Sequence, residues 1–257
     1  MLAALLELAP GGVEQVDHPS RVAGGDGFVE YAVYGAPGEL PPFPSGSAEV
    51  GGVLVQVSGE PVADDWAERW KQFHEPVLVG DRVYVRPPWA DARPGTLDIV
   101  VDPGQAFGTG AHATTRLSLE LLLELPAGGS FADLGCGSGV LAIAAARLGF
   151  GPVVAVDNEE AALEATRANA AANGVTLDRV ERIDLRSAHP PAAETVAANL
   201  MRPLLLRLAE SMEERPNMLI LSGVLDEEAD EVAAAFAPLR ERRRLSSQGW
   251  SALLLSR

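Results

Sequence analysis

A short glycine-rich segment carries the clearest chemical signal in this chain. Residues 131–139 read F-A-D-L-G-C-G-S-G, with glycines at positions 135, 137 and 139. Such a loop lets a ligand approach the backbone, and the helix expected after it offers unpaired N–H donors. The G-x-G-x-G spacing is one residue shorter than the G-x-G-x-x-G of dinucleotide folds. It therefore favours S-adenosylmethionine over a nicotinamide, with Gly135, Gly137 and Gly139 around its methionine part.

Carboxylates on both sides of this loop are the next candidates. Asp157 ends the following apolar stretch, P-V-V-A-V-D, and a carboxylate there can accept both ribose hydroxyls of an adenosyl group. The alternative is that Asp157 only caps the next helix. We expect Asp133 to order the glycine loop or to lie beside the methionine amino group. Glu159 and Asp184 are weaker candidates, the latter for the adenine edge.

The segment D-P-G-Q-A-F-G-T-G-A-H-A-T-T at 102–115 describes a structured loop that crosses an active site. Thr114 and Thr115 can cap the helix that follows or donate to a bound carboxylate. His112 is either a base or, as is commoner for one His among small residues, a hydrogen-bonding loop residue. Cys136 has no His motif beside it, so we interpret it as loop filler and not as a nucleophile. No His, Cys and Asp spacing suggests a metal site.

Asn199 follows the apolar stretch T-V-A-A and precedes L-M-R-P. At the carboxyl end of a parallel strand, where ligands sit, its amide oxygen can accept from an incoming amine and orient the nitrogen lone pair. Asn199 is therefore the candidate catalytic residue. The alternative is a helix cap before Pro203. Methyl transfer relies mainly on alignment, although an amine nucleophile must lose its proton to solvent or to a nearby group.

The elements that must position these residues alternate between helix and strand from residue 112 onward. We expect strands at 130–134, 152–157, 178–183, 195–199 and 217–222, and helices at 113–124, 139–148, 159–172, 203–214 and 226–237. This alternation predicts an α/β fold with a Rossmann-like, doubly wound parallel sheet. A closing pair of strands around the Q-G turn at 248–249 adds a terminal antiparallel strand, which is typical of class I methyltransferases.

The first part of the chain predicts a small α+β domain, with a helix in L-A-A-L-L-E-L and strands at 28–34 and 50–57. A helix at 64–74 places Trp66, Trp70 and Phe73 on one face, and a strand follows at 97–101. We therefore expect a substrate-recognition domain at 1–60, a linking segment at 61–95 and a methyltransferase domain at 96–257.

Composition restricts the partners. The formal net charge is −16, with 36 acidic against 20 basic residues, which disfavours a nucleic-acid requirement and favours a basic partner. Simple solubility is the alternative, and four arginines between 240 and 244 form a local basic patch. No apolar run has the length of a membrane span, and the N-terminus lacks the pattern of a signal peptide. The single cysteine permits no internal disulfide, which suits a cytoplasmic protein.

Together these segments resemble the ribosomal protein L11 methyltransferase family over roughly residues 60–257. The residues that carry the resemblance are the stretches at 64–76, 102–115, 133–145, 169–175 and 221–225 together with Asn199. By this match Thr115, Gly135, Asp157 and Asn199 contact S-adenosylmethionine, and we add Phe107, Gly108 and Thr109 to the cofactor site. The resemblance implies methylation of lysine side-chain and N-terminal amino groups on ribosomal protein L11, and we expect a monomer.

Two departures from the family pattern bear on the substrate. The family usually continues after Asn199 with an aliphatic and a small residue, whereas here Leu200, Met201 and Arg202 follow, and Arg202 puts a charge near the target amine. The chain also opens in a helix where the family has a strand. The rival readings are a methyltransferase of another protein, RNA or a small molecule, and a noncatalytic S-adenosylmethionine-binding module. A nicotinamide oxidoreductase is disfavoured by the loop spacing.

Overall fold

The computed structural model describes residues 74–103, 110 and 112–257, together with the backbone of four short N-terminal strands. The chain divides into two compact units, Met1–Trp66 and Ala67–Arg257. Phe107, Gly108 and Thr109 lie outside the described residues, as do the expected opening helix and all but the last residue of the helix expected at 64–74.

Two antiparallel pairs of strands make up the described part of the first unit. β1 (Glu14–Val16) pairs with β2 (Glu30–Ala32), and β3 (Gly46–Val50) pairs with β4 (Val53–Val57). The prediction of one strand at 50–57 is wrong, because Val50 ends one strand and faces Val53, which begins the other. β2 lies within the strand expected at 28–34, and β1 was not predicted.

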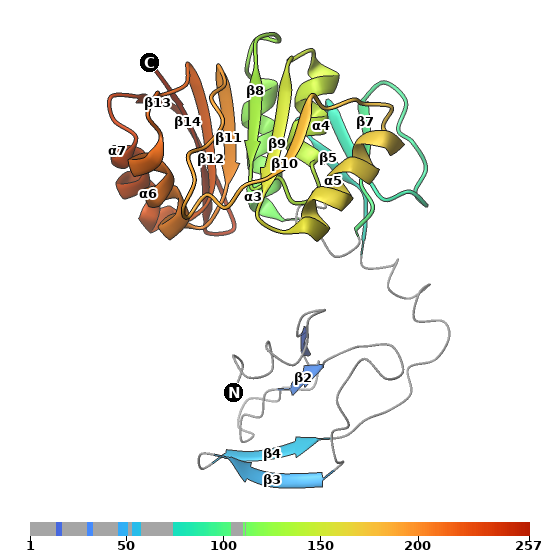
Figure 1. Cartoon of the computed structure of the whole chain (residues 1–257). Coiled ribbons are helices and arrows are strands. Elements are labelled where there is room, and N and C mark those ends of the chain that lie inside the picture. Colours follow the sequence, from blue (N-terminus) through green and yellow to red (C-terminus); the bar gives the residue numbers. More distant parts are fainter. Residues whose placement is uncertain are drawn as a thin grey trace. The chain divides into compact units, whose positions relative to one another are not determined.

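A seven-stranded sheet forms the centre of the second unit, in the order β10-β9-β8-β11-β12-β14-β13 (Figure 1). Its strands are β8 (Phe131–Leu134), β9 (Val153–Asp157), β10 (Arg179–Arg182), β11 (Thr195–Asn199), β12 (Met218–Leu225), β13 (Arg240–Ser247) and β14 (Trp250–Ser256). The first five are parallel, whereas β14 runs antiparallel to β12 and β13. The predicted doubly wound α/β sheet with a terminal antiparallel strand is confirmed.

Helices cover both faces of this sheet, because side chains alternate between the faces along each strand. Phe131 packs with the helices on one face, and its neighbours Ala132 and Leu134 pack with those on the other. The first face carries α3 (Ala113–Leu123), α4 (Val140–Leu148) and α5 (Glu160–Ala172), and the second carries α6 (Arg202–Ser211) and α7 (Ala229–Ala235). A 3₁₀ turn, Asp226–Glu228, precedes α7, where we had expected one helix from 226 to 237.

A second, three-stranded sheet precedes the large one in the chain. β5 (Val77–Val79) runs antiparallel to β6 (Val83–Arg86), which is parallel to β7 (Leu97–Val100). β7 matches the expected strand at 97–101, but β5 and β6 lie in the segment taken only as a link. The sequence pattern that could have predicted β5 and β6 is the pair of short apolar stretches V-L-V and V-Y-V-R. They flank a turn in which Gly80 and Asp81 both have a φ of 53°.

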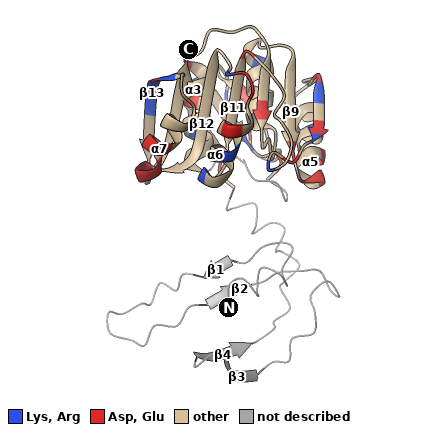
Figure 2. Ribbon diagram, turned by 60° about the vertical axis from the view of Figure 1, so that its left-hand side comes forward, with Lys and Arg blue, Asp and Glu red and all other residues tan. Residues whose placement is uncertain are grey.

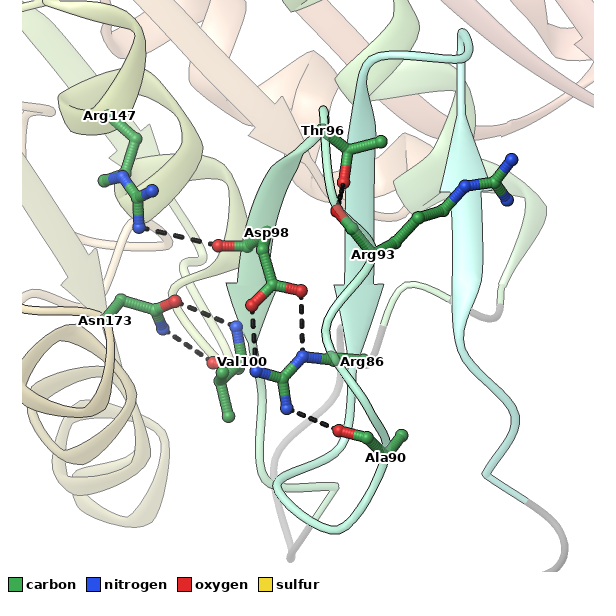
Figure 3. Close-up of polar contacts among 8 residues, drawn as sticks. All are labelled: Arg86, Ala90, Arg93, Thr96, Asp98, Val100, Arg147 and Asn173. Atoms are coloured by element: carbon green, nitrogen blue, oxygen red, sulfur yellow. Dashed lines mark hydrogen bonds and ion pairs between the residues drawn. The ribbon is translucent and has the colours of Figure 1, made fainter.

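Polar contacts join this small sheet to the helices of the large one (Figure 3). Arg86 of β6 forms two hydrogen bonds of 2.8 Å with the carboxylate of Asp98 in β7. Asn173, at the end of α5, accepts from the Val100 N–H at 2.8 Å and donates to the Val100 carbonyl at 2.6 Å. The segment that leads into residues 102–115 is therefore anchored on both sides.

No helix within the described part of the chain is long and apolar enough to cross a membrane.

Candidate functional site

The strand order creates a switch point between β8 and β11. β9 and β10 extend the sheet on one side of β8, while β11 and β12 extend it on the other. In open α/β sheets, ligands bind at the carboxyl ends of strands where the order reverses in this way. The glycine loop follows β8 and Asn199 ends β11, so both candidate elements lie at this point.

Close packing requires glycine at two positions of the loop. Gly135 has a φ of 76°, and a Cβ there would overlap the side chain of Leu200, which follows β11. Gly139 has a φ of 79°, and a Cβ there would lie 2.8 Å from Cγ2 of Thr166 in α5. Any larger residue would thus push away either α5 or the segment after Asn199.

Asp133 is buried beneath the loop, with 1% of its surface exposed. One carboxylate oxygen accepts from the N–H of Ala142, in the first turn of α4, at 3.0 Å. The pKa of Asp133 is raised to about 7: burial is the main cause and the nearby Asp157 adds to it, while the Ala142 hydrogen bond acts in the opposite direction. The side chain thus ties the end of β8 to α4, directly below the glycine loop.

Asp157 is half-buried at the end of β9 and holds the loop from the other side. Its Oδ2 accepts from the N–H of Gly137 at 3.0 Å, and its Oδ1 accepts from the N–H of Glu159 at 3.1 Å. Glu159, not Asp157, is the N-cap residue of α5. The carboxylate therefore contacts both the loop and the turn before α5.

Thr115 carries a buried hydroxyl group that has no hydrogen-bond partner among the described residues. It lies inside α3 and is 1% exposed. The expectation that Thr114 or Thr115 caps this helix is wrong, because Nδ1 of His112 accepts from the Thr114 N–H at 3.3 Å. An unsatisfied buried hydroxyl costs about 1–3 kcal/mol, so this group is suited to a ligand.

A small cavity of about 20 Å³ brings Thr115 together with Asp133, Gly135 and Asn199. Its remaining lining residues are Cys136, Val140 and Leu141. The volume is about that of one water molecule. Four residues singled out from distant parts of the sequence thus line one space, and Gly137, Gly139 and Asp157 adjoin it through the loop.

A larger cavity of about 440 Å³ lies at the opposite end of the strands. Ser130, which precedes β8, and Glu194, which precedes β11, contribute to its wall. None of the residues predicted from the sequence to act in catalysis or cofactor binding lines this cavity.

His112 and Cys136 both lie in packed, hydrogen-bonded surroundings. The His112 ring packs edge-on against Trp250 at 5.2 Å, and burial, together with the nearby Arg116, lowers the pKa of the imidazole. The Cys136 thiol is 6% exposed, and burial raises its pKa well above the usual range. Cys136 is therefore a neutral thiol that fills the loop.

Arg202 and two of the four arginines of β13 are paired with carboxylates. Arg202 forms two hydrogen bonds with Glu231 of α7, at 2.6 and 2.7 Å, so its charge is paired with a carboxylate there. In β13, Arg243 pairs with Glu124 at 3.5 Å and Arg244 with Asp230 at 2.7 Å. Figure 2 shows the basic stretches of β13 in blue and the acidic ones of α7 in red. Met201, in contrast, is 75% exposed beside the site.

Several contributing residues carried no assigned role in the sequence. Leu200 covers Gly135, and Thr166 and Asn169 of α5 contact the carbonyls of the glycine loop. The signal for Asn169 was its place in the stretch N-A-A-A-N-G-V, whose two amides lie one helical turn apart. Within the described ranges, no group of three His, Cys, Asp or Glu residues is arranged to hold a metal ion.

Comparison with known proteins gives one consistent relationship. The profile of a family described as "Ribosomal protein L11 methyltransferase" matches residues 49–257. Ribosomal protein L11 methyltransferase of Pelobacter propionicus is 42% identical over 211 residues, which cover 76% of this chain and 67% of that protein. The protein of the same name from Cupriavidus pinatubonensis is 40% identical over 195 residues, 74% of this chain and 65% of that protein.

A solved structure of ribosomal protein L11 methylase from Lactobacillus delbrueckii subsp. bulgaricus superimposes with a TM-score of 0.63 at 28% identity. The superposition covers 72% of this chain and 99% of that one. The match thus spans about two thirds of the length of the two curated relatives and nearly all of the solved chain.

Proposed function

This chain belongs to the ribosomal protein L11 methyltransferase family, and we propose that it transfers methyl groups from S-adenosylmethionine to lysine side-chain and N-terminal amino groups of ribosomal protein L11. The observation that carries the proposal is the buried hydroxyl group of Thr115, which has no hydrogen-bond partner among the described residues and lines one cavity with Asp133, Gly135 and Asn199. An orphan donor beside a glycine loop fits a ligand that brings its own acceptor.

The residues around the switch point have the chemistry that S-adenosylmethionine requires. Gly135, which lines the cavity, and Gly137 and Gly139 of the same loop would surround its methionine part, and the Thr115 hydroxyl can donate to its carboxylate. The Asp157 carboxylate can accept from both ribose hydroxyls by exchanging its present backbone partners. The cofactor supplies a methyl group on a sulfonium, which is a good leaving group. Phe107, Gly108 and Thr109 belong to the same proposed site.

Asn199 is the proposed catalytic residue. Its amide oxygen accepts a hydrogen bond from the incoming amine and directs the nitrogen lone pair toward the methyl carbon. The support is its place at the carboxyl end of β11, on the wall of the same cavity as Thr115 and Gly135. Alignment of this kind supplies most of the rate, because the amine needs only to release its proton to solvent or to a nearby group.

The proposed partner is a basic protein. The net charge of −16 attracts such a substrate, whereas several basic residues that would bind phosphates are held by carboxylates. We propose that residues 1–60 recognise ribosomal protein L11, that residues 61–95 connect this domain to the methyltransferase domain at 96–257, and that no nucleic acid is required. A ribosomal substrate places the enzyme in the cytoplasm, and we propose that it acts as a monomer.

The test is incubation of the full chain with labelled S-adenosylmethionine and purified ribosomal proteins, followed by intact-mass measurement. We expect ribosomal protein L11 to gain mass in steps of one methyl group, and the Asn199→Ala variant to bind the cofactor but transfer slowly. If RNA or a small molecule takes up the label while the mass of ribosomal protein L11 is unchanged, the proposed substrate is wrong. Cofactor binding with no transfer to any acceptor would favour a noncatalytic binding module.

A further inference from the structure

Helix α5 holds the glycine loop from beneath through two buried side chains. Thr166 and Asn169 lie one helical turn apart and are 0% and 3% exposed. The Thr166 hydroxyl donates to the carbonyl of Gly137 at 2.9 Å, and the Asn169 amide donates to the carbonyl of Ser138 at 2.9 Å. Two successive carbonyls of the loop are thus fixed toward α5.

Asn169 also reaches the other candidate loop. Its Oδ1 accepts from the N–H of Asp102 at 3.0 Å, and Asp102 is the first residue of the 102–115 segment. One partner of the amide is a carbonyl and the other is an N–H group, so only one orientation of the amide satisfies both. Asn169 is therefore a buried link between the glycine loop and the segment that leads to Thr115.

Asn173, one turn further along α5, is a suitable control for Asn169, because its amide has different partners. Its amide both donates to and accepts from Val100 of β7 (Figure 3). It donates as well to the carbonyl of Asn169 within α5. No described hydrogen bond joins Asn173 to the glycine loop. It fastens β7 to α5, whereas Asn169 joins the two loops.

We propose that Asn169 is a positioning residue that sets the glycine loop and the 102–115 segment in register with each other. This inference rests on the proposed function, in which both loops contact S-adenosylmethionine. Asn169 itself lies below the loop and acts only through it. Since both ends of the buried amide are satisfied, a shift of one loop leaves either the Ser138 carbonyl or the Asp102 N–H without its partner, which couples the two positions.

A double-mutant cycle between Asn169 and Thr115 tests this coupling. The dissociation constant of S-adenosylhomocysteine is measured by calorimetry for the full chain, for Thr115→Val, for Asn169→Ala and for the double variant. We expect Asn169→Ala to weaken binding about tenfold. The fold-loss caused by Thr115→Val should be at least about three times smaller when Asn169 is already replaced by Ala than in the otherwise wild-type chain. The same cycle with Asn173→Ala is the control, and we expect its two effects to multiply independently.

Independent effects of Asn169 and Thr115, as in the Asn173 cycle, would overturn the inference. A second measurement needs no variant: in hydrogen exchange of the wild-type chain, S-adenosylhomocysteine should protect the Asp102 amide together with residues 135–140. Protection confined to 135–140 would also count against the link. Failure of the wild-type chain to bind the ligand at all would instead contradict the proposed function, so the two failures are distinguishable.

Discussion

Two aspartates beside the glycine loop, one in β8 and one at the end of β9, have different surroundings. Asp133 is almost fully buried and accepts from one N–H, whereas Asp157 is half-buried and accepts from two. Burial favours the neutral form of the Asp133 carboxyl, whereas Asp157 is more accessible and contacts the loop directly. We therefore assign Asp133 to the support of the loop and Asp157 to ligand binding.

The raised pKa of Asp133 predicts a pH-dependent stability. Its folded pKa, about 7, lies above its ordinary value of 3.8, so the fold favours the protonated form. The stabilisation is complete below about pH 4 and is lost as the pH rises through about 7, with a total on the order of 4 kcal/mol at most. An asparagine side chain has no such titration, so the Asp133→Asn variant should gain in relative stability between these pH values. Urea unfolding at pH 5 and 8 measures this, and equal pH slopes for the two proteins would contradict it.

Replacement of Asp157 should abolish binding of S-adenosylmethionine. Asp157→Ala removes the acceptor proposed for the ribose hydroxyls. It also removes the hydrogen-bond acceptor of the Gly137 N–H, so the glycine loop loses one of its supports. Calorimetric titration measures the affinity. Glu160→Ala is the control, since Glu160 lies three residues further on, in the first turn of α5, and its side chain is exposed. An affinity for Asp157→Ala equal to that of the control would exclude the ribose assignment.

At the scale of elements, an irregularity in β12 determines where Asn199 lies. The pairing of β12 with β14 shifts between Ser222 and Val224, and Gly223 has a φ of 84°. A Cβ on Gly223 would overlap the backbone carbonyl group of Leu200, the residue after Asn199. The bulge thus lets the backbone beside the proposed catalytic residue pack directly against the neighbouring strand.

Gly223→Ala should accordingly displace the segment after Asn199. We expect a loss of stability of about 2–4 kcal/mol, from the positive φ together with the overlap, and a lower kcat. Gly174→Ala is a matched control, because Gly174 also has a positive φ, 62°, but has open space around its Cβ position. Thermal unfolding and methylation rates compare the two. An equal effect of both substitutions would mean that close packing at Gly223 has no role.

Prediction from sequence succeeded where elements bury a continuous face. β8, β9 and β11 were located to within a residue at each end, since their apolar runs are buried on both faces. β5 and β6 were missed because runs of three or four residues are too short to show a period. The capping by His112 and the covering of Gly135 by Leu200 depend on tertiary packing, so no local pattern reveals them.

For the whole molecule, charge is the property most relevant to the proposed partner. With a net charge of −16, long-range attraction should assist encounter with a basic protein and weaken as salt screens it. We expect the KM for ribosomal protein L11 to rise severalfold between about 0.05 and 0.5 M salt while kcat changes little. The dissociation constant of S-adenosylhomocysteine in the same buffers is the control. A KM that does not respond to salt would contradict electrostatic recruitment.

The central claim is that the cavity at the switch point, with the Thr115 hydroxyl, binds S-adenosylmethionine. Thr115→Val keeps the shape of the side chain and removes the unpartnered hydroxyl. Without ligand, the Thr115→Val variant should therefore be more stable than the wild-type chain by about 1 kcal/mol. Its affinity for S-adenosylmethionine should instead fall about tenfold. Thermal unfolding and calorimetric titration of the same two proteins decide the matter. Opposite changes in stability and affinity are the predicted result, and an unchanged affinity would contradict the account.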